Sequence, residues 1–239
     1  MSTPKYSVVI PMKNEEDNIG QLIKEIEPVM GGLGKPWELI CIDDGSTDKT
    51  LPILESLTKE KDFLRVIVFD RNYGQSSAFD VGFREARGDF IITLDGDLQN
   101  DPNDIPKLLV LAERYDLVCG VRQKRRDTII KRVTSFLANK VRSRFCGDGV
   151  SDTGCSLKVY RRSCFDKIKM FHGMHRFLPA LFIIEGFEVH EIPVNHRERM
   201  HGTTKYNFFN RSFNTIADMF AVRWMRKRRL NYQIKQELP

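Results

Sequence analysis

The 239-residue chain has few features of membrane-spanning, secreted or repetitive proteins. Its longest nearly apolar run, residues 177–184, contains Pro179 and is far shorter than the roughly 20 residues of a membrane-spanning helix. The N-terminus has no basic-then-apolar signal sequence, and no repeat or low-complexity block interrupts the chain. We therefore expect one globular domain with a C-terminal arm.

Cysteine is also scarce. The five cysteines form an odd set without a C-x-x-C pair, and Cys41 and Cys119 fall within predicted buried strands. A buried thiol acts as a small apolar side chain. We interpret the cysteines as structural and the compartment as reducing.

The common nucleotide-binding loops are absent. No G-x-G-x-x-G follows the first predicted strand. Gly34-Lys35 matches the end of a P-loop, but Val29 and Pro36 occupy positions where that motif needs glycine and a hydroxyl. Dinucleotide-dependent oxidoreductases and P-loop kinases are therefore disfavoured.

Basic residues are unevenly placed in a chain of net charge +6. Residues 122–144 hold nine Lys and Arg against one acid, and residues 210–239 hold seven against two, so the remainder is net acidic. Two basic zones on an acidic body indicate anionic partners, such as phosphates, nucleic acid or a membrane surface.

Strand and helix patterns alternate along the first half of the chain. Near-continuous apolar strands are predicted at 6–10, 37–42, 66–69, 90–94 and 117–121, with helices at 75–86 and 102–113. Asn14 is predicted to cap the first helix, and Ser46 or Thr47 the second. Later strands are expected at 156–160 and 188–194, a helix from about Ser163, and a long helix over 206–230. This order predicts an α/β fold, a mostly parallel sheet with helices on both faces.

Polar residues follow the predicted strands where ligands bind to such sheets. Asn14-Glu15 follows the first strand, Asp43-Asp44 the second, Asp95-Gly96-Asp97 the fourth and Arg122 the fifth. Two carboxylates around a glycine at a strand end can hold Mg²⁺ or Mn²⁺ against a diphosphate. Asp43 or Asp44 can accept hydrogen bonds from a nucleotide, although one such acid would also serve as a helix cap.

Three motifs together resemble the inverting family 2 glycosyltransferases of GT-A fold. They are Val8-Val9-Ile10-Pro11-Met12-Lys13-Asn14-Glu15, Ile42-Asp43-Asp44-Gly45-Ser46 and Asp95-Gly96-Asp97-Leu98-Gln99. Within that family the chain is most similar to the polyprenyl-phosphate glycosyltransferases, which include dolichol-phosphate mannose synthase. The resemblance covers roughly residues 6 to 210.

The resemblance implies roles for individual residues. Nucleotide contacts are expected from Pro11, Asn14, Glu15, Asp43, Asp44 and Asp95. A metal site is expected at Asp95, Asp97 and Gln99. Phosphate contacts are expected from Arg122, Arg132, Arg199 and Lys205, the last two on a loop, 199–206, that closes over the donor. His175-Arg176-Phe177 matches a short motif of the undecaprenyl branch, which makes His175 and Arg176 further catalytic candidates beside Asp97.

The expected function is metal-dependent transfer of a sugar from a UDP- or GDP-sugar to a polyprenyl phosphate or similar lipid phosphate. A phosphate acceptor is largely ionised at neutral pH and needs cations rather than a general base. Asp152 is then a loop anchor. The alternative is a hydroxyl acceptor on a saccharide or lipid, with Asp152 as the base. An inactive regulatory subunit is a further alternative, which the intact Asp95 and Asp97 disfavour.

The C-terminal helix carries a basic, aromatic face. Phe209, Phe213, Ile216, Phe220 and Trp224 recur at helical spacing, and basic residues cluster at the end. We expect domain 1–206 to be catalytic, and segment 207–239 to bind a membrane surface, a membrane-anchored partner or the catalytic domain itself. The expected location is cytoplasmic, at the inner face of a membrane. A nucleic-acid-binding module is the alternative from another class, but the acids at strand ends would repel a phosphate backbone.

Overall fold

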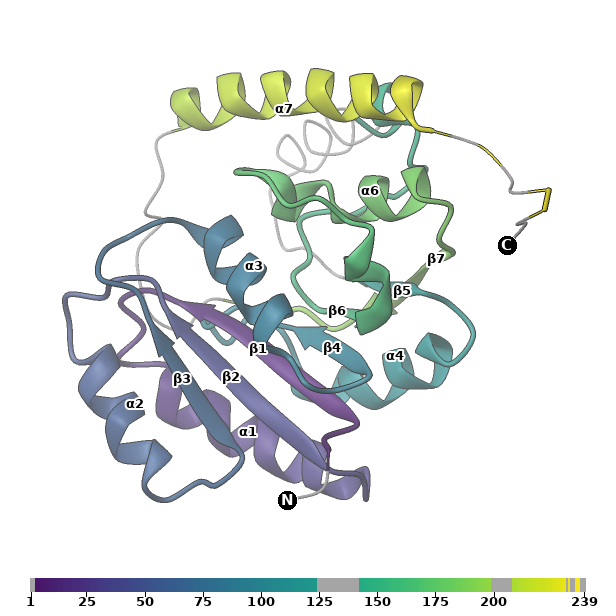
Figure 1. The fold of residues 1–239 in the computed structure, drawn as a ribbon. Helices are drawn as coiled ribbons and strands as arrows, with labels where there is room; N and C mark the ends of the chain where they lie inside the picture. Colours follow the sequence, from purple (N-terminus) through teal and green to yellow (C-terminus); the bar gives the residue numbers. More distant parts are fainter. Residues whose placement is uncertain (1–2, 124–141, 199–207, 231, 233–234, 237–239) are drawn as a thin grey trace.

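The computed structural model describes residues 3–123, 142–198, 208–230, 232 and 235–236. Within them seven strands form one sheet in the order β3-β2-β1-β4-β6-β5-β7 (Figure 1). The strands are β1 (Tyr6–Met12), β2 (Trp37–Asp43), β3 (Leu64–Val68), β4 (Phe90–Thr93), β5 (Leu117–Arg122), β6 (Lys158–Arg161) and β7 (Val189–Val194). Only β6 runs antiparallel to its neighbours, β4 and β5. The predicted mostly parallel sheet is confirmed.

Helices cover both faces of the sheet. On one face lie α1 (Ile19–Gly32), α2 (Thr50–Thr58) and α4 (Ile105–Ala112), and on the other α3 (Gln75–Glu85), α6 (Leu178–Ile184) and α7 (Phe208–Arg228). Short 3₁₀ turns are η1 (Pro102–Asp104), η2 (Arg162–Asp166) and η3 (Met174–Arg176). Successive side chains of a strand point to opposite faces, so Val8 packs in one core and Val9 in the other, both with no exposed surface. This explains the near-continuous apolar strands.

Two predicted helix starts are wrong. Helix α1 begins at Ile19 rather than after Asn14, which has a left-handed φ of 51° and donates its backbone N–H to Ser46 Oγ. Helix α2 begins at Thr50, because the Ser46 hydroxyl is hydrogen-bonded to the Asp43 carboxylate instead of capping a helix. Asn14, Ser46 and Thr47 are residue types that commonly cap helices. Here they instead connect the β1–α1 loop to the β2–α2 loop by hydrogen bonds.

Three further elements differ in detail from the prediction. The helix expected from Ser163 is the 3₁₀ turn η2, and the helix expected at 102–113 starts as the 3₁₀ turn η1. The strand expected at 156–160 is β6, which begins at Lys158. The predicted domain boundary at 206/207 lies outside the described residues.

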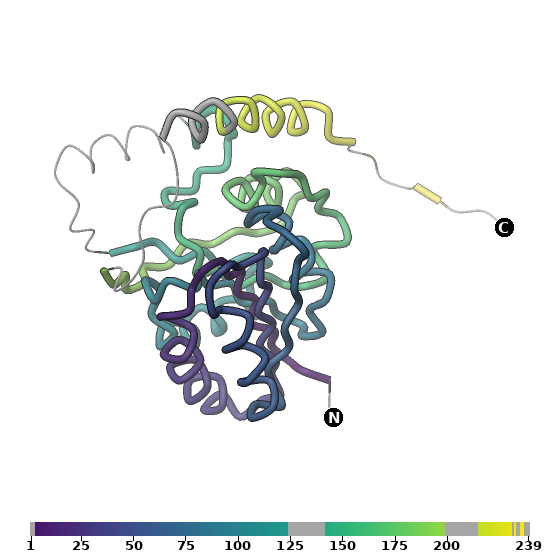
Figure 2. The backbone as a smooth tube through the Cα atoms, turned by 90° about the vertical axis from the view of Figure 1, so that its left-hand side faces the viewer, coloured from purple at the N-terminus to yellow at the C-terminus, as the bar shows by residue number. Residues whose placement is uncertain are grey.

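Helix α7 lies on the same side of the sheet as α3 and α6, away from the N-terminus (Figures 1 and 2). Val222 is fully buried, and Met219 and Met225 pack beside it against the core around α6. Ile216, Phe220 and Trp224 lie on a different stripe and are 52, 61 and 63% exposed. The described part of the predicted aromatic face is therefore exposed, while another face packs on the domain. The side chains of Phe209 and Phe213 lie outside the described part.

Candidate active site at the carboxyl edge of the sheet

The ends of β1, β2 and β4 meet at one edge of the sheet. Strand β1 pairs in parallel with β2 on one side and with β4 on the other, so the residues after all three strands emerge together. A Cβ atom on Gly96 would lie 3.3 Å from Glu15 Cγ and 3.7 Å from the Pro11 carbonyl oxygen. The Asp95-Gly96-Asp97 turn therefore packs directly against the β1–α1 loop, as the strand-end pattern predicts.

The two acids after β2 organise the surrounding loops. Asp43 Oδ1 accepts a hydrogen bond from the Ser46 backbone N–H at 3.2 Å, and the Asp43 residue is 1% exposed. The Asp44 carboxylate accepts from the backbone N–H groups of Tyr73 at 2.6 Å and Gly74 at 2.9 Å, just before α3. Both carboxylates thus fix loop backbones at this edge. Whether they also contact a nucleotide stays a prediction.

Asn14 and Glu15 tie the β1–α1 loop to the β2–α2 loop. Asn14 Oδ1 accepts from the Thr47 N–H at 2.8 Å, and the Glu15 N–H donates to Thr50 Oγ1 at 2.8 Å. Glu15 Oε2 accepts from Asn18 Nδ2 at 2.7 Å. Residues predicted to bind a nucleotide therefore hold the two loops at a fixed separation, through the Asn14 side chain and the Glu15 backbone, which is what a preformed ligand site requires.

The Asp95-Gly96-Asp97 turn is fixed by hydrogen bonds from several elements. The Asp95 N–H donates to Asn100 Oδ1 at 3.1 Å, and the same oxygen accepts from Ser156 Oγ at 2.7 Å. Asp97 is 7% exposed, and its Oδ1 accepts from the Gln99 N–H at 3.2 Å. The Gln99 side-chain Nε2 lies 3.4 Å from His196 Nε2 and 3.5 Å from the Arg197 carbonyl oxygen.

Burial raises the pKa of the Asp95 carboxyl, and the negative charge of Asp97 raises it further. A hydrogen bond with Ser156 and the positive charges of Lys158 and Arg122 act in the opposite direction. Two crowded carboxylates at a buried strand end form an oxygen-donor pair that suits a hard divalent cation. Among the described residues no group of three or more His, Cys, Asp and Glu side chains has metal-binding geometry.

A cavity of about 270 Å³ adjoins this turn. Five of the predicted site residues line it: Asp95, Arg122, Asp152, His175 and Arg176. These residues come from the ends of β4 and β5, the loop before β6 and the turn η3, so the fold brings together residues up to 81 positions apart in the sequence. Residues that were predicted from separate motifs therefore line one cavity.

Arg122 and Asp152 form a two-pronged ion pair within that cavity. Arg122 Nε donates to Asp152 Oδ2 at 2.8 Å and Nη2 to Oδ1 at 2.7 Å, and the Arg122 backbone N–H donates to Oδ2 at 3.2 Å. The side chains are 19 and 8% exposed. Such a geometry orients the guanidinium plane, because two parallel hydrogen bonds leave it no free rotation. Asp152 acts here as an anchor for Arg122.

His175 and Arg176 are held by two different elements. His175 Nδ1 lies 2.7 Å from Ser76 Oγ, which also accepts from the Gly173 N–H at 3.0 Å. Arg176 Nη1 donates to Thr215 Oγ1 of α7 at 3.2 Å. Helix α7 therefore contacts the turn that places both side chains at the cavity.

Sequence reasoning missed several contributors to the cavity. Gln75 Nε2 donates to Asp95 Oδ1 at 3.0 Å from the first turn of α3. Lys158 is 3% exposed, and its Nζ donates to the Thr153 carbonyl oxygen at 3.4 Å and to that of Cys155. Glu191 of β7 accepts from the Ser151 N–H at 2.9 Å, which fixes the loop that carries Asp152. Lys158, a lysine within an otherwise apolar strand, was the one sequence signal of a buried polar site. Gln75 and Glu191 gave no such signal.

Three predicted phosphate-binding residues, Arg132, Arg199 and Lys205, lie outside the described residues, as does the rest of the 199–206 loop. Residues 124–141 and 199–207 are drawn as a grey trace in Figure 1. The predicted roles of these three side chains remain predictions.

Comparison with known proteins decides the family. Residues 7–169 match glycosyl transferase family 2. The chain belongs to this family. It is 39% identical over 224 residues to a dodecaprenyl-phosphate galacturonate synthase of Rhizobium johnstonii, covering 91% of this chain and 66% of that protein. It is 40% identical over 217 residues to an undecaprenyl-phosphate 4-deoxy-4-formamido-L-arabinose transferase of Salmonella paratyphi B, covering 90% of this chain and 66% of that protein. This family 2 chain thus spans about two thirds of the length of these curated relatives.

Solved structures agree on the fold. Glucosyl-3-phosphoglycerate synthase from Mycobacterium tuberculosis, in complex with Mn²⁺, UDP and phosphoglyceric acid, matches with a TM-score of 0.72 at 20% identity. The match covers 92% of this chain and 78% of that one. The predicted family and GT-A-like fold are confirmed. No helix among the described residues is long and apolar enough to cross a bilayer.

Proposed function

We propose that this chain transfers one sugar from a UDP- or GDP-sugar to the phosphate of a polyprenyl phosphate or similar lipid phosphate. The observation that carries the proposal is the 270 Å³ cavity, in which Arg122, Lys158 and Arg176 lie beside Asp95. Cations at a strand end next to a carboxylate pair suit two phosphate-bearing substrates. The names of the two curated relatives, both sugar transferases or synthases of polyprenyl phosphates, support the same acceptor class.

The donor side of the proposal uses the edge formed by β1, β2 and β4. Pro11, Asn14 and Glu15 after β1, with Asp43 and Asp44 after β2, would surround the nucleoside. Asp95 and Asp97 would hold Mg²⁺ or Mn²⁺, because carboxylate oxygens with a substrate diphosphate are the usual ligand set of such ions. When bound, the ion supplies neutralisation of the charge that develops on the leaving diphosphate.

The acceptor side uses cations rather than a base. An oxygen of the acceptor phosphate attacks the anomeric carbon, a new carbon–oxygen bond forms, and the sugar–diphosphate bond breaks with its electron pair leaving on the nucleoside diphosphate. A phosphate monoester needs no deprotonation at neutral pH, its second pKa being about 6. The two hydrogen bonds to Asp152 fix the orientation of the Arg122 guanidinium, so its remaining N–H groups point in one direction. Single in-line displacement inverts the anomeric configuration.

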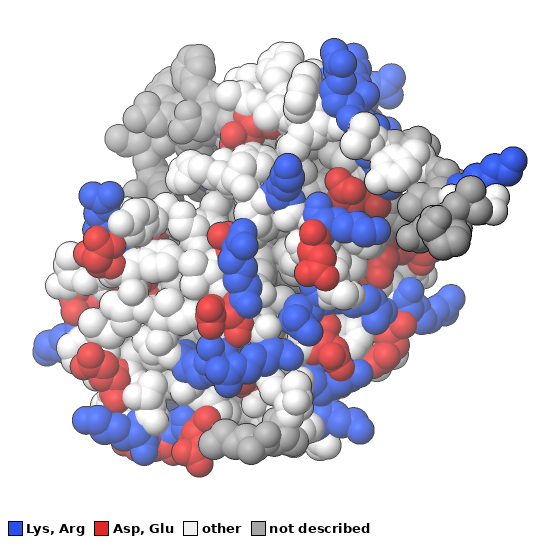
Figure 3. Space-filling view, in the orientation of Figure 1, with Lys and Arg blue, Asp and Glu red and all other residues white. Residues whose placement is uncertain are grey.

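Helix α7 would place this active site at a lipid surface. Its exposed stripe of Ile216, Phe220 and Trp224 is followed by basic residues in the last turn, Arg226, Lys227 and Arg228. Figure 3 shows basic side chains gathered where α7 ends in that view. An exposed apolar stripe beside cations is the pattern of helices that lie in a membrane interface. We propose cytoplasmic, peripheral attachment through segment 207–239, with residues 1–206 as the catalytic domain.

Thermal unfolding with UDP and GDP, each with and without Mn²⁺, tests the donor site. A ligand at 100 times its Kd stabilises the folded state by about 2.7 kcal/mol, or roughly 5–10 °C in Tm for a chain of this size. We expect a metal-dependent shift with one nucleotide, abolished in Asp97→Ala. The matched control is Asp62→Ala. This variant removes an exposed carboxylate just before β3, at the amino end of that strand and so away from the carboxyl edge of the sheet. Equal shifts in Asp97→Ala and the wild type would contradict the proposed metal site.

A further inference from the structure

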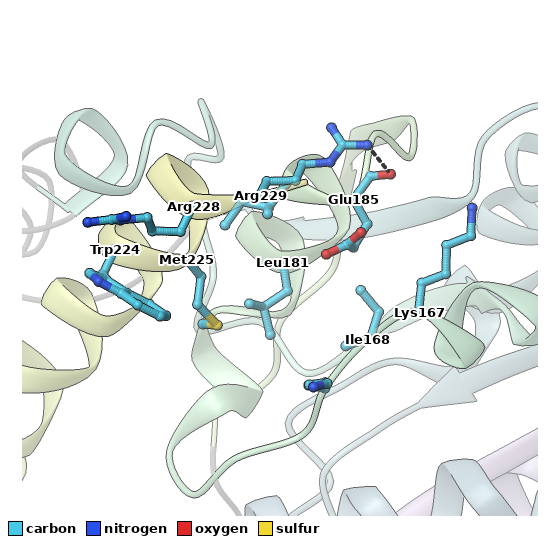
Figure 4. Close-up of a pocket in the computed structure, with 10 residues that line it drawn as sticks. Lys167, Ile168, Leu181, Glu185, Trp224, Met225, Arg228 and Arg229 are labelled. Carbon is cyan, nitrogen blue, oxygen red and sulfur yellow. Dashed lines mark hydrogen bonds between the residues drawn. The ribbon is translucent and has the colours of Figure 1, made fainter. Parts of the chain in front are cut away.

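A second cavity lies under the C-terminal end of α7. Its volume is about 240 Å³, and it is bounded by α6, α7 and the segment after η2 (Figure 4). Helix α6 connects the two cavities: Leu178 at its start lines the catalytic cavity, and Glu185 just after its end lines this one. Leu181, one helical turn after Leu178, also lines the second cavity, but no described residue lines both. The second cavity is therefore separate from the proposed active site.

The floor of this cavity is apolar. Ile168, Leu181 and Ile184 are buried to 7, 5 and 7% exposure, and Met225 of α7 packs beside them. In Figure 4 the side chains of Leu181, Met225 and Ile168 lie close to one another below α7. An apolar floor of this kind favours hydrocarbon over water, because covering it removes apolar surface from solvent.

The rim of the cavity is cationic. Lys167 and Lys169 come from the segment after η2, and Arg228 and Arg229 from the end of α7, against a single acid, Glu185. All four cations are exposed, and none of them forms an ion pair with an acid among the described residues. Arg229 Nη2 donates to the Glu185 carbonyl oxygen at 3.0 Å, which holds that guanidinium at the rim. The rim thus offers charge that is complementary to an anion.

The cavity is continuous with the exposed stripe of α7. Trp224 belongs to both: it is 63% exposed, lines the cavity, and lies one helical turn after Phe220. Leu230, next along the chain from Arg229, is 80% exposed. Tryptophan beside cations is typical of the boundary between lipid and water. The opening therefore lies where the proposed membrane contact of α7 would place lipid headgroups.

We propose that this cavity binds one anionic phospholipid of the membrane, with its phosphate at the cationic rim and the start of an acyl chain on the apolar floor. This lipid is a phospholipid of the surrounding bilayer, bound at one site, and it is not the sugar acceptor. The proposal rests on the membrane contact of α7 proposed above, and it is independent of the identity of the sugar.

Binding to vesicles separates this site from general membrane attachment. Wild-type protein should bind phosphatidylcholine vesicles weakly, and much more tightly when they contain phosphatidylglycerol. The double variant Lys167→Ala/Lys169→Ala should weaken binding to the anionic vesicles by about thirtyfold, roughly fivefold for each cation near the surface. Its control, Lys35→Ala/Lys59→Ala, removes two exposed lysines beside α1 and α2 on the opposite face of the sheet. Trp224→Ala should weaken binding to both kinds of vesicle.

A soluble probe separates a built site from surface charge alone. Short-chain phosphatidylglycerol, below its micelle concentration, should bind the full chain saturably by calorimetry, and this binding should be lost in Lys167→Ala/Lys169→Ala but kept in the control pair. Equal binding of inorganic phosphate would show a simple anion site and overturn the lipid assignment. Absence of saturable short-chain lipid binding in a protein that still binds vesicles would overturn the site alone. Failure of the wild type to bind any vesicle would overturn the membrane contact of α7 as well.

Discussion

Replacing Asp152 distinguishes an anchor of Arg122 from a general base. In Asp152→Ala the guanidinium of Arg122 loses two charge-assisted hydrogen bonds, and its backbone N–H loses a third. Removing one partner of a fully buried pair costs about 3–5 kcal/mol. The Arg122 side chain is 19% exposed, so water relieves part of that cost and we expect about 2–3 kcal/mol. For a chain of this length the Tm should fall by about 5–10 °C.

The kinetic signature follows from the same geometry. Without its anchor Arg122 loses its fixed orientation toward phosphate oxygens, so the KM for substrate should rise together with the loss of stability. Asp152→Asn should behave similarly, since its amide would keep one acceptor oxygen and replace the other with an N–H donor that faces the N–H groups of Arg122. The matched control is Asp116→Ala. Asp116 forms an ion pair with Arg161 and directly precedes β5, at the end of that strand opposite to Arg122. It should lower the Tm while leaving KM unchanged.

A general base would give a different result. A hydroxyl acceptor needs proton removal, which typically contributes 10²–10⁴-fold to the rate. If Asp152→Asn kept the wild-type Tm and KM but lost kcat by that factor, and the acidic limb of the pH–rate profile disappeared, the anchor assignment would be refuted. The alternative of a saccharide or lipid hydroxyl acceptor would then be favoured.

Three further predictions concern other parts of the molecule. Burial raises the pKa of the Cys41 thiol to about 12, and the other four cysteines are also buried, so Ellman's reagent should label no cysteine in the native protein and five after unfolding. Gly45→Ala should cost at least 3 kcal/mol in chemical denaturation, because Gly45 has a φ of +65° and its new Cβ would lie 2.5 Å from the Arg71 carbonyl carbon, whereas Gly34→Ala, at φ +61° in open space, should cost only about 1 kcal/mol. Ser76→Ala should lower kcat/KM about tenfold by releasing His175, whereas Ser77→Ala, which removes a half-buried hydroxyl that donates to the Tyr73 carbonyl oxygen, should not; equal effects would contradict a positioning role for Ser76.

The sheet and the edge that carries the candidate site could be predicted because the signals are local. Buried parallel strands read as unbroken apolar runs, and polar residues directly after them must lie at the carboxyl edge. Asp95 and Arg122 follow this rule and line the same cavity. The family resemblance added His175 and Arg176, which no local pattern would have placed there.

The helix starts and the partner residues could not be predicted, because they depend on contacts distant in sequence. Asn14 is a residue type that often caps helices. In this structure, however, its loop is hydrogen-bonded to Ser46 and Thr50, which lie 32 to 35 positions further along the chain. Gln75 reaches Asp95 across 20 residues, and Glu191 reaches Ser151 across 40. Likewise α7 carries two apolar stripes, and only the packing of Val222 shows which one faces the domain.

The most direct test of the central claim is the chemical nature of the acceptor. Purified protein in vesicles with Mn²⁺ would be given a panel of UDP- and GDP-sugars, with either undecaprenyl phosphate or undecaprenol. The lipid products would be identified by mass spectrometry and their anomeric configuration determined by NMR. The account predicts a glycosylated lipid phosphate with inverted anomeric configuration, formed only from the phosphorylated acceptor. A product formed equally well from undecaprenol, or one that retains the donor configuration, would contradict it.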